Sequence, residues 1–280
     1  MPSPGLSLVG FLDQQSAITH LRSACVLADD SDLALQAEWS AAKAKLGPAV
    51  SNAGTPDIQP LPAAGVAHVA SLTQQPWVQQ ALQHQGALLG ASFQLVEIEP
   101  LLAFQFTVDA TRSAHHNGGL PGKPSNDELL SICLPLQQAV EQIQIQQAPG
   151  SMMLTSRSLN LRMLAQGFLN GAFLGMHVGL ALPFVHVVRH NGRCYLHNGF
   201  HRAVGLRARG VTHVPCVLRD VPDHQSIGLV PGGTFDAALM ESTDPPTLGH
   251  FTNGNAHQVT LKSYHRTLHI SWAEYATTHD

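Results

Sequence analysis

Hydrophobic residues recur at near-helical spacing through much of the first 90 residues, which predicts a helical N-terminal region over residues 1–90. The expected helices run from Phe11 to Leu46, with a break at Asp29–Asp32, and then over residues 66–72 and 77–89. Prolines and glycines between Ser51 and Gly65 indicate a loop. Residues 1–8 are rich in Pro, Ser and Gly, so we expect them to be irregular.

Apolar and polar residues begin to alternate near residue 91, which is typical of strands. Phe93–Leu102 predicts one strand, and Phe104–Val108 predicts a second strand or its continuation. Further along, Val185–Val188 and Arg193–Leu196 predict a hairpin. Its turn is Asn191-Gly192, since Asn and Gly tolerate the positive φ of a two-residue loop.

Loops and helical patterns occupy the chain between these strands. Ala114–Pro124 contains two adjacent histidines and several glycines, so we expect a surface loop. The more specific alternatives for this segment are a lid over a ligand or a metal- or phosphate-binding loop. Ser125 and Glu128 have the spacing of a capping box and predict a helix start. Helices are expected over Leu129–Ile145, with an interruption near Pro135, and over Leu159–Leu169.

The last part of the chain, residues 223–280, is expected to form an extension that packs on the central domain. Phe235–Met240 predicts a helical turn, and Gln258–Leu261 and Thr267–Trp272 alternate as two short strands. The histidines of this segment have no spacing typical of a metal site, so we interpret them as scattered.

One stretch combines a strand end, a glycine and a basic helix start: Asn198-Gly199-Phe200-His201-Arg202. The following residues predict a helix that Gly210 ends, and Val214–Leu218 then predicts a buried strand. A glycine before a helix lets a ligand approach the backbone, and the first helical N–H groups attract anions. Because Arg202 can fork onto a phosphate, the pattern predicts a phosphate site. The alternative is a plain strand–turn–helix with a solvated Arg202.

This stretch resembles the signature box of the ParB/sulfiredoxin superfamily. In that family a strand leads into Gly-x-(His or Arg)-Arg, a helix, a Gly, and a strand that begins Val-Pro. The resemblance covers residues 184–221 well, extends weakly back to Leu95, and is carried by Gly199, His201, Arg202, Val214 and Pro215. It implies an α+β fold, with a small mixed sheet and helices over residues 91–222, followed by a short C-terminal segment of strands.

The family box binds nucleotide phosphates, which gives the matching residues an implied role. The resemblance implies a nucleotide cofactor (ATP, ADP or CTP), with Mg²⁺ as a companion ion. The residues that would bind it are Asn198, Gly199, Phe200, His201 and Arg202.

The family includes sulfiredoxins, CTP-hydrolysing partition proteins and free serine kinases, and this chain departs from the first two. Sulfiredoxins have a Cys immediately before the His-Arg pair, where this chain has Phe200, and Cys194 is expected to be buried in a strand. Partition proteins have a DNA-binding helical domain after the box, for which the sequence gives no signal. The resemblance therefore favours a small-molecule phosphotransferase or a nucleotide hydrolase.

Phosphoryl transfer needs a carboxylate to accept a proton and a metal to offset phosphate charge. The candidate catalytic residues are Glu97 and Glu99, near the end of the first strand, together with His201; Asp109 is a less favoured third carboxylate. The two glutamates are equally explained as exposed strand carboxylates. The alternatives to an enzyme are a non-catalytic nucleotide-sensing or partner-binding module and a ParB-like DNA-associated protein.

Composition limits the classes of ligand and partner that we expect. A net charge of −4 with 12% charged residues argues against general binding of nucleic acid. Residues 185–220 nevertheless gather six arginines against one acid, which suits a small anion. The four cysteines have no CxxC spacing, and no leader-like segment is visible, so we expect reduced thiols and a cytoplasmic protein. The most apolar stretch, Phe168–Val188, is interrupted by polar residues and falls short of a membrane span.

Overall fold

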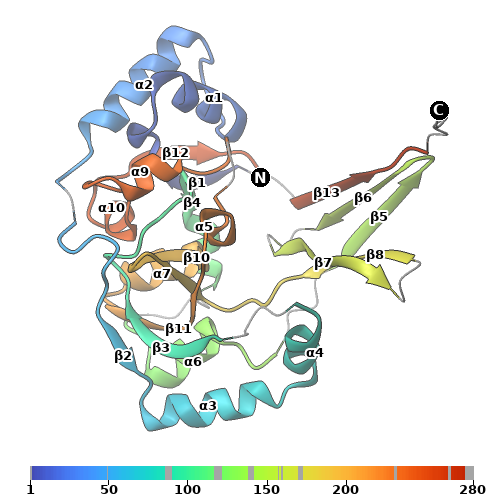
Figure 1. Ribbon diagram of the computed structural model, residues 1–280. Helices are drawn as coiled ribbons and strands as arrows, with labels where there is room; N and C mark the ends of the chain where they lie inside the picture. The colour runs from blue at the N-terminus through green and yellow to red at the C-terminus, as the bar shows by residue number, and fades with distance from the viewer. Residues whose placement is uncertain are drawn as a thin grey trace. The chain divides into compact units, whose positions relative to one another are not determined.

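The computed structural model describes residues 2–48, 50–85, 90–116, 122–137, 142–156, 158, 160–169, 173–229, 232–263 and 266–274. Helices and strands are mixed along the chain, which confirms the predicted α+β class (Figure 1). The chain divides into two compact units, each built from segments that are not consecutive. The first unit comprises Met1–Gln75, Leu88–Leu136 and Phe184–Ser263; the second comprises Pro76–Ala87, Gln137–Pro183 and Tyr264–Asp280.

A five-stranded sheet lies at the centre of the first unit, in the strand order β10-β9-β11-β3-β2. β9 and β10 form an antiparallel hairpin, and β11 runs parallel to β9. β3 pairs antiparallel with β11 on one side and with the edge strand β2 on the other. The strands are β2 (Ile58–Pro60), β3 (Ser92–Glu97), β9 (His186–His190), β10 (Arg193–Asn198) and β11 (His213–Asp220).

The hairpin and the helix predicted around Gly199 are confirmed. Asn191 and Gly192 have φ values of 49° and 77°, so both turn residues are left-handed. α7 (Phe200–Arg207) follows β10, and Gly210, with φ 80°, closes the turn after it. Because α7 connects β10 to β11, its first turn lies at the C-terminal end of β10.

The first residues form a strand, so the expectation of an irregular N-terminus was wrong. β1 (Ser3–Ser7) lies between β12 (His257–Leu261) and β4 (Thr107–Asp109) in an antiparallel sheet. Gly5 packs so closely on Leu261 that a Cβ at this position would lie 2.6 Å from Leu261 Cδ1. β1 therefore forms because it pairs with strands far along the chain and because Gly5 has no side chain to clash with Leu261. The strand propensity of its own residues does not favour it.

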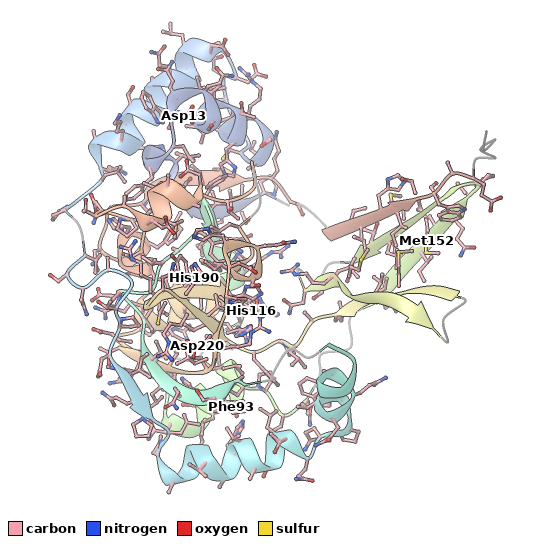
Figure 2. The ribbon with its side chains drawn as sticks, viewed as in Figure 1. Asp13, Phe93, His116, Met152, His190 and Asp220 are labelled. Carbon is pink, nitrogen blue, oxygen red and sulfur yellow. The ribbon has the colours of Figure 1, made fainter. Side chains whose placement is uncertain are left out.

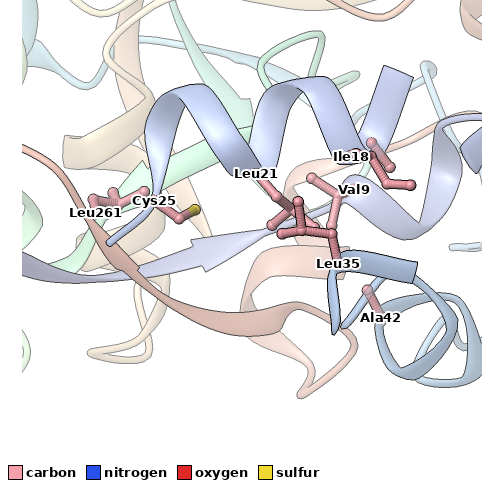
Figure 3. Packing of buried hydrophobic residues seen from close by; sticks show 8 residues of the cluster. Val9, Ile18, Leu21, Cys25, Leu35, Ala42 and Leu261 are labelled. Carbon is pink, nitrogen blue, oxygen red and sulfur yellow. The ribbon is translucent and has the colours of Figure 1, made fainter. Parts of the chain in front are cut away.

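Two helices pack beside this sheet and confirm the predicted break near residue 30. Asp13 caps α1 (Gln14–Ala24) and Ser31 caps α2 (Asp32–Ala44), each through a side chain that accepts a backbone N–H. Together with the short η1 (Val9–Phe11), they bury a cluster shown in Figure 3. Its members are Val9, Ala17, Ile18, Leu21, Cys25, Leu35, Ala42 and Leu261.

α6 (Asn126–Cys133) begins at the predicted capping box, with Ser125 as its cap. The expected interruption near Pro135 is confirmed, but the helix expected to reach Ile145 was wrong at that end, where a strand begins. Leu134 has φ −133° and ψ 64°, because the following Pro135 disfavours helical backbone in the residue before it. α6 therefore ends at Cys133, and Ile143 starts a strand of the second unit.

The remaining helices of the first unit are α3 (Ala63–Thr73), α5 (Ala110–His116), α8 (His224–Ile227), α9 (Ala237–Glu241) and α10 (Leu248–Thr252). α5 takes up the start of the segment expected to be a loop, so His115 and His116 lie on a helix. Residues 117–121 of that segment lie outside the described residues.

The second unit is mostly β structure. One sheet has the order β13-β6-β5, and a separate hairpin pairs β7 with β8. Its elements are α4 (Pro76–Gln85), β5 (Ile143–Ala148), β6 (Ser151–Ser156), β7 (Leu161–Leu169), β8 (Phe173–Leu180) and β13 (Arg266–Ser271). The helix expected over 159–169 was wrong for its described part, because β7 pairs with β8 from end to end.

The two strands predicted near the C-terminus are confirmed, but they do not pair with each other. β12 belongs to the sheet of β1, and β13 belongs to the sheet of β6.

Candidate phosphate-binding site

Gly199 stands between β10 and α7 and fixes the geometry of the turn. Its φ of 102° and ψ of 20° lie in the left-handed region that favours glycine. A Cβ here would lie 3.0 Å from Val185 Cγ2, so the turn passes close to the chain before β9. Gly199 is the N-cap of α7 and has no side chain with which to cap it. The first N–H groups of a helix have no carbonyl partner within it, so this start can donate to a ligand.

Arg202 lies beside this turn, but it is buried, with 8% of its surface exposed. Its Nη2 lies 3.5 Å from the position that a Cβ on Gly199 would take. Its Nη1 donates to the carbonyl oxygen of Ile132 on α6 at 3.2 Å. The alternative of a solvated Arg202 is therefore wrong: this side chain links α7 to α6 while its guanidinium adjoins Gly199.

A second helix brings further basic side chains to the start of α7. Arg112 and His116 are four residues apart on α5, so they share one face of that helix. The rings of His116 and His201 have centroids 6.3 Å apart. Figure 2 labels His116, the last residue of α5. Arg112, His116, His201 and Arg202 are called the basic cluster below.

One carboxylate, Asp109, lies within electrostatic reach of His201. Its Oδ2 accepts from the hydroxyl of Ser3 at 2.7 Å and lies 3.7 Å from Nε of Arg112. Its Oδ1 accepts from the backbone N–H of Arg112 at 3.0 Å. Asp109 is thus buried and hydrogen-bonded through both oxygens, and it holds α5 and β1 together.

The imidazole of His201 is neutral at physiological pH. Removal from solvent, followed by the charges of neighbours that include His116, Arg112 and Arg202, lowers its pKa from 6.5 to about 4. The same kinds of cause lower the pKa of His116 to about 4. His116 is the more exposed of the two rings, so the case for a neutral imidazole rests on His201. An anion bound between these groups would favour their protonated forms.

Asn198 and Phe200 shape the turn with their side chains. Nδ2 of Asn198 donates to the carbonyl oxygen of Phe184 at 3.0 Å. Phe200 is buried, and its ring packs edge-on against Phe104, with centroids 5.3 Å apart. Phe200 therefore contributes its backbone, rather than its ring, to the helix start.

The two glutamates expected near the phosphate lie at the other end of α7. Glu99 pairs with Arg207, the last residue of that helix, at 2.9 Å. Glu97 accepts from the backbone N–H of Asp57 and stands opposite His213 in the sheet. A helix rises about 1.5 Å per residue, so the length of α7, roughly 10 Å, separates them from its start.

The thiols offer no nucleophile to this site. Cys133 lies near Arg202, but it is fully buried, and burial raises its pKa to about 12. Burial likewise raises the pKa of Cys194 to about 11, in agreement with its expected place inside a strand. A thiol becomes a nucleophile as the thiolate, which burial disfavours here.

The structure adds Arg112 to the residues predicted from sequence. Asp109, Arg112 and His116 follow one another at helical spacings of three and four, a signal that could have predicted α5, where no helix was expected from the sequence. Within the described ranges, no group of three or more His, Cys, Asp or Glu is arranged to hold a metal ion.

Comparison with known proteins adds no further assignment: no family model, no curated protein and no solved structure matches this chain. In the part of the chain that the structure describes, no helix has the length and apolar character needed to cross a membrane.

Proposed function

We propose that the start of α7 binds the phosphate of a nucleotide. One observation carries the proposal: α5 brings Arg112 and His116 to the helix start that already holds His201 and Arg202. Two helices far apart in sequence thereby supply cations and polarisable imidazoles around uncapped backbone donors. Such donors and guanidinium groups are the groups that recognise phosphate oxygens.

The local geometry supports close approach of the ligand. Gly199 has no side chain, and its left-handed conformation turns the backbone into the helix without one. Three other arginines of the first unit contact partners away from this turn: Arg189 pairs with Asp220, Arg193 donates to carbonyls of α9 and its end, and Arg207 pairs with Glu99. The side chain of Arg112 is 27% exposed, so a ligand can reach it from solvent.

The resemblance to the ParB/sulfiredoxin box agrees with this assignment, since that box binds nucleotide phosphates. The ligand class is therefore a nucleotide such as ATP, ADP or CTP, with or without Mg²⁺. A non-catalytic use of the nucleotide, as a sensor, requires the same site.

The experiment is a thermal-shift panel with ATP, ADP, CTP, GTP and inorganic phosphate, each with and without Mg²⁺. A ligand that binds the folded state raises the melting temperature, by an amount that follows its concentration over Kd. We expect a rise with at least one nucleotide, reduced in Arg112→Gln and retained in Arg207→Gln, a matched arginine at the far end of α7. A rise that survives Arg112→Gln, or none with the wild type, contradicts the proposal.

A further inference from the structure

The basic cluster contains two imidazoles and two guanidinium groups, a set suited to moving protons at a phosphate ester. We infer that the site cleaves a small ribonucleotide phosphodiester by acid–base catalysis, with His201 as the base and His116 as the acid. This inference rests on the proposed phosphate site and names its substrate class.

Charge favours a diester over a triphosphate. Before a substrate binds, when both imidazoles are neutral, Arg112 and Arg202 set against Asp109 leave a single positive charge around the helix start. A phosphodiester carries one negative charge, whereas a nucleoside triphosphate carries several. Binding the diester would match the charge of the site without further counterions.

The nucleophile must come from the substrate, because neither the nearby thiol nor the nearby carboxylate can supply it. Cys133 is a buried thiol, and both oxygens of Asp109 are occupied by Ser3 and by α5. A ribonucleotide supplies its own nucleophile, the 2′-hydroxyl next to the phosphate. Cleavage of such a substrate requires a base, an acid and positive charge from the protein, and the basic cluster contains these groups.

The two helices divide the proton roles. His201 is in the first turn of α7, where the positive end of the helix dipole favours a neutral imidazole. His116 is in the last turn of α5 and is the more exposed of the two rings. The surroundings lower its pKa in the free protein, but the negative end of the helix dipole and the negative charge of a bound diester both favour the imidazolium that the acid role requires. His201 is therefore the base and His116 the acid. The other charged or titratable groups that face them are Asp109, Arg112, His115 and Arg202.

The reaction balances with these groups. His201 takes the proton of the 2′-hydroxyl as its oxygen forms a bond to phosphorus. The bond from phosphorus to the 5′-oxygen breaks, and His116 gives that oxygen a proton. The products are a 2′,3′-cyclic phosphate and a free 5′-hydroxyl, and Arg112 and the helix N–H groups hold the other phosphate oxygens throughout.

The test incubates the full chain with an equimolar pool of ribodinucleotide monophosphates, in EDTA, and identifies products by mass spectrometry. The matching deoxyribodinucleotide pool is the substrate control. We expect cyclic phosphates from the ribonucleotides alone. His201→Gln and His116→Gln should each slow cleavage by about 10²–10⁴-fold, which is the usual contribution of a general acid or base. His213→Gln, a histidine at the far end of α7, should leave the rate unchanged.

The pH profile separates catalysis from a structural role. The wild type should give a bell-shaped profile; His201→Gln should lose its acid limb and His116→Gln its alkaline limb. Cleavage that needs a divalent metal, cleavage of the deoxy pool, or unaltered profiles would overturn the inference. If the protein binds a nucleotide but cleaves no ribodinucleotide, the inference is overturned and the proposed function stands. If it binds no nucleotide, the inference and the proposed function both fail.

Discussion

Arg202 shows how burial changes the meaning of a residue at a helix start. Sequence places it where it could fork onto a phosphate, and the structure adds a second task, because its Nη1 donates to Ile132 on α6. A hydrogen bond to a charged group is worth roughly 1.5–3 kcal/mol, and the carbonyl left behind would lose its partner. A variant at this position therefore tests folding as well as binding.

We predict that Arg202→Ala lowers the free energy of unfolding by about 1.5–3 kcal/mol. Arg207→Ala removes the same side chain from the same helix, but its partner Glu99 is partly exposed, so the loss should stay below about 1 kcal/mol. Urea denaturation of both variants measures the difference. Equal losses would mean that the contact with α6 does not stabilise the fold.

Gly199 can be tested against another left-handed glycine. Gly199→Ala and Gly192→Ala both force a side chain into positive φ, at about 1–2 kcal/mol. Only the first also meets Val185, with a Cβ contact of 3.0 Å, whereas nothing lies within 4 Å at Gly192. We expect Gly199→Ala to cost roughly 1 kcal/mol more in urea denaturation. The reverse order would contradict the described turn.

At the scale of elements, the sequence predicted those pieces whose signals are local. The Asn191-Gly192 turn, the capping box at Ser125 and the glycine after α7 each dictate backbone geometry within a few residues, and each was confirmed. Pro135 also carried a local signal, and the interruption expected near it is where α6 ends.

Elements made by distant partners could not be predicted in this way. β1 contains Pro4 and Gly5 and becomes a strand because β12 and β4 pair with it from far along the chain. β7 contains good helix formers and is a strand because β8 lies next to it. The same limit applies to the basic cluster: Arg112 meets His201 through the packing of α5 on α7, which no local pattern shows.

Deleting residues 1–8 tests the role of β1. The deletion removes the middle strand of a three-stranded sheet, the Ser3 contact to Asp109 and the fully buried Leu8. We expect a loss of at least about 3 kcal/mol, since truncating a buried leucine alone costs roughly 2–5 kcal/mol. Deleting residues 1–2 is the control and should change little. Similar stability of the two truncated chains, measured by thermal unfolding, would show that β1 is dispensable.

For the whole molecule, partly buried histidines with lowered pKa values make acid a destabilising condition. Desolvation lowers the pKa of His20 to about 4, and desolvation with nearby cations lowers that of His186 to about 3, each from 6.5. Between these values the unfolded chain binds more protons than the folded one. The stability from these groups is therefore complete above pH 6.5 and is lost as the pH falls toward the folded pKa values.

We predict that each such histidine contributes up to about 1.4 kcal/mol of lost stability per pH unit in that window. His20, whose ring packs edge-on against Phe106, is the residue to vary. Urea unfolding at a series of pH values should show a shallower acid loss for His20→Gln than for the wild type. An unchanged slope would mean that His20 does not stay neutral in the fold.

The central claim is that the start of α7 and the facing side of α5 bind a nucleotide phosphate. The most direct test is a titration of isotopically labelled protein with the nucleotide that the thermal panel selects, followed by amide and histidine-ring NMR signals. We predict shifts concentrated at Gly199–Arg202 and Arg112–His116, with the ring signals of His201 among those that change. Shifts confined to other elements, or a His201 ring that does not respond at saturating nucleotide, would contradict it.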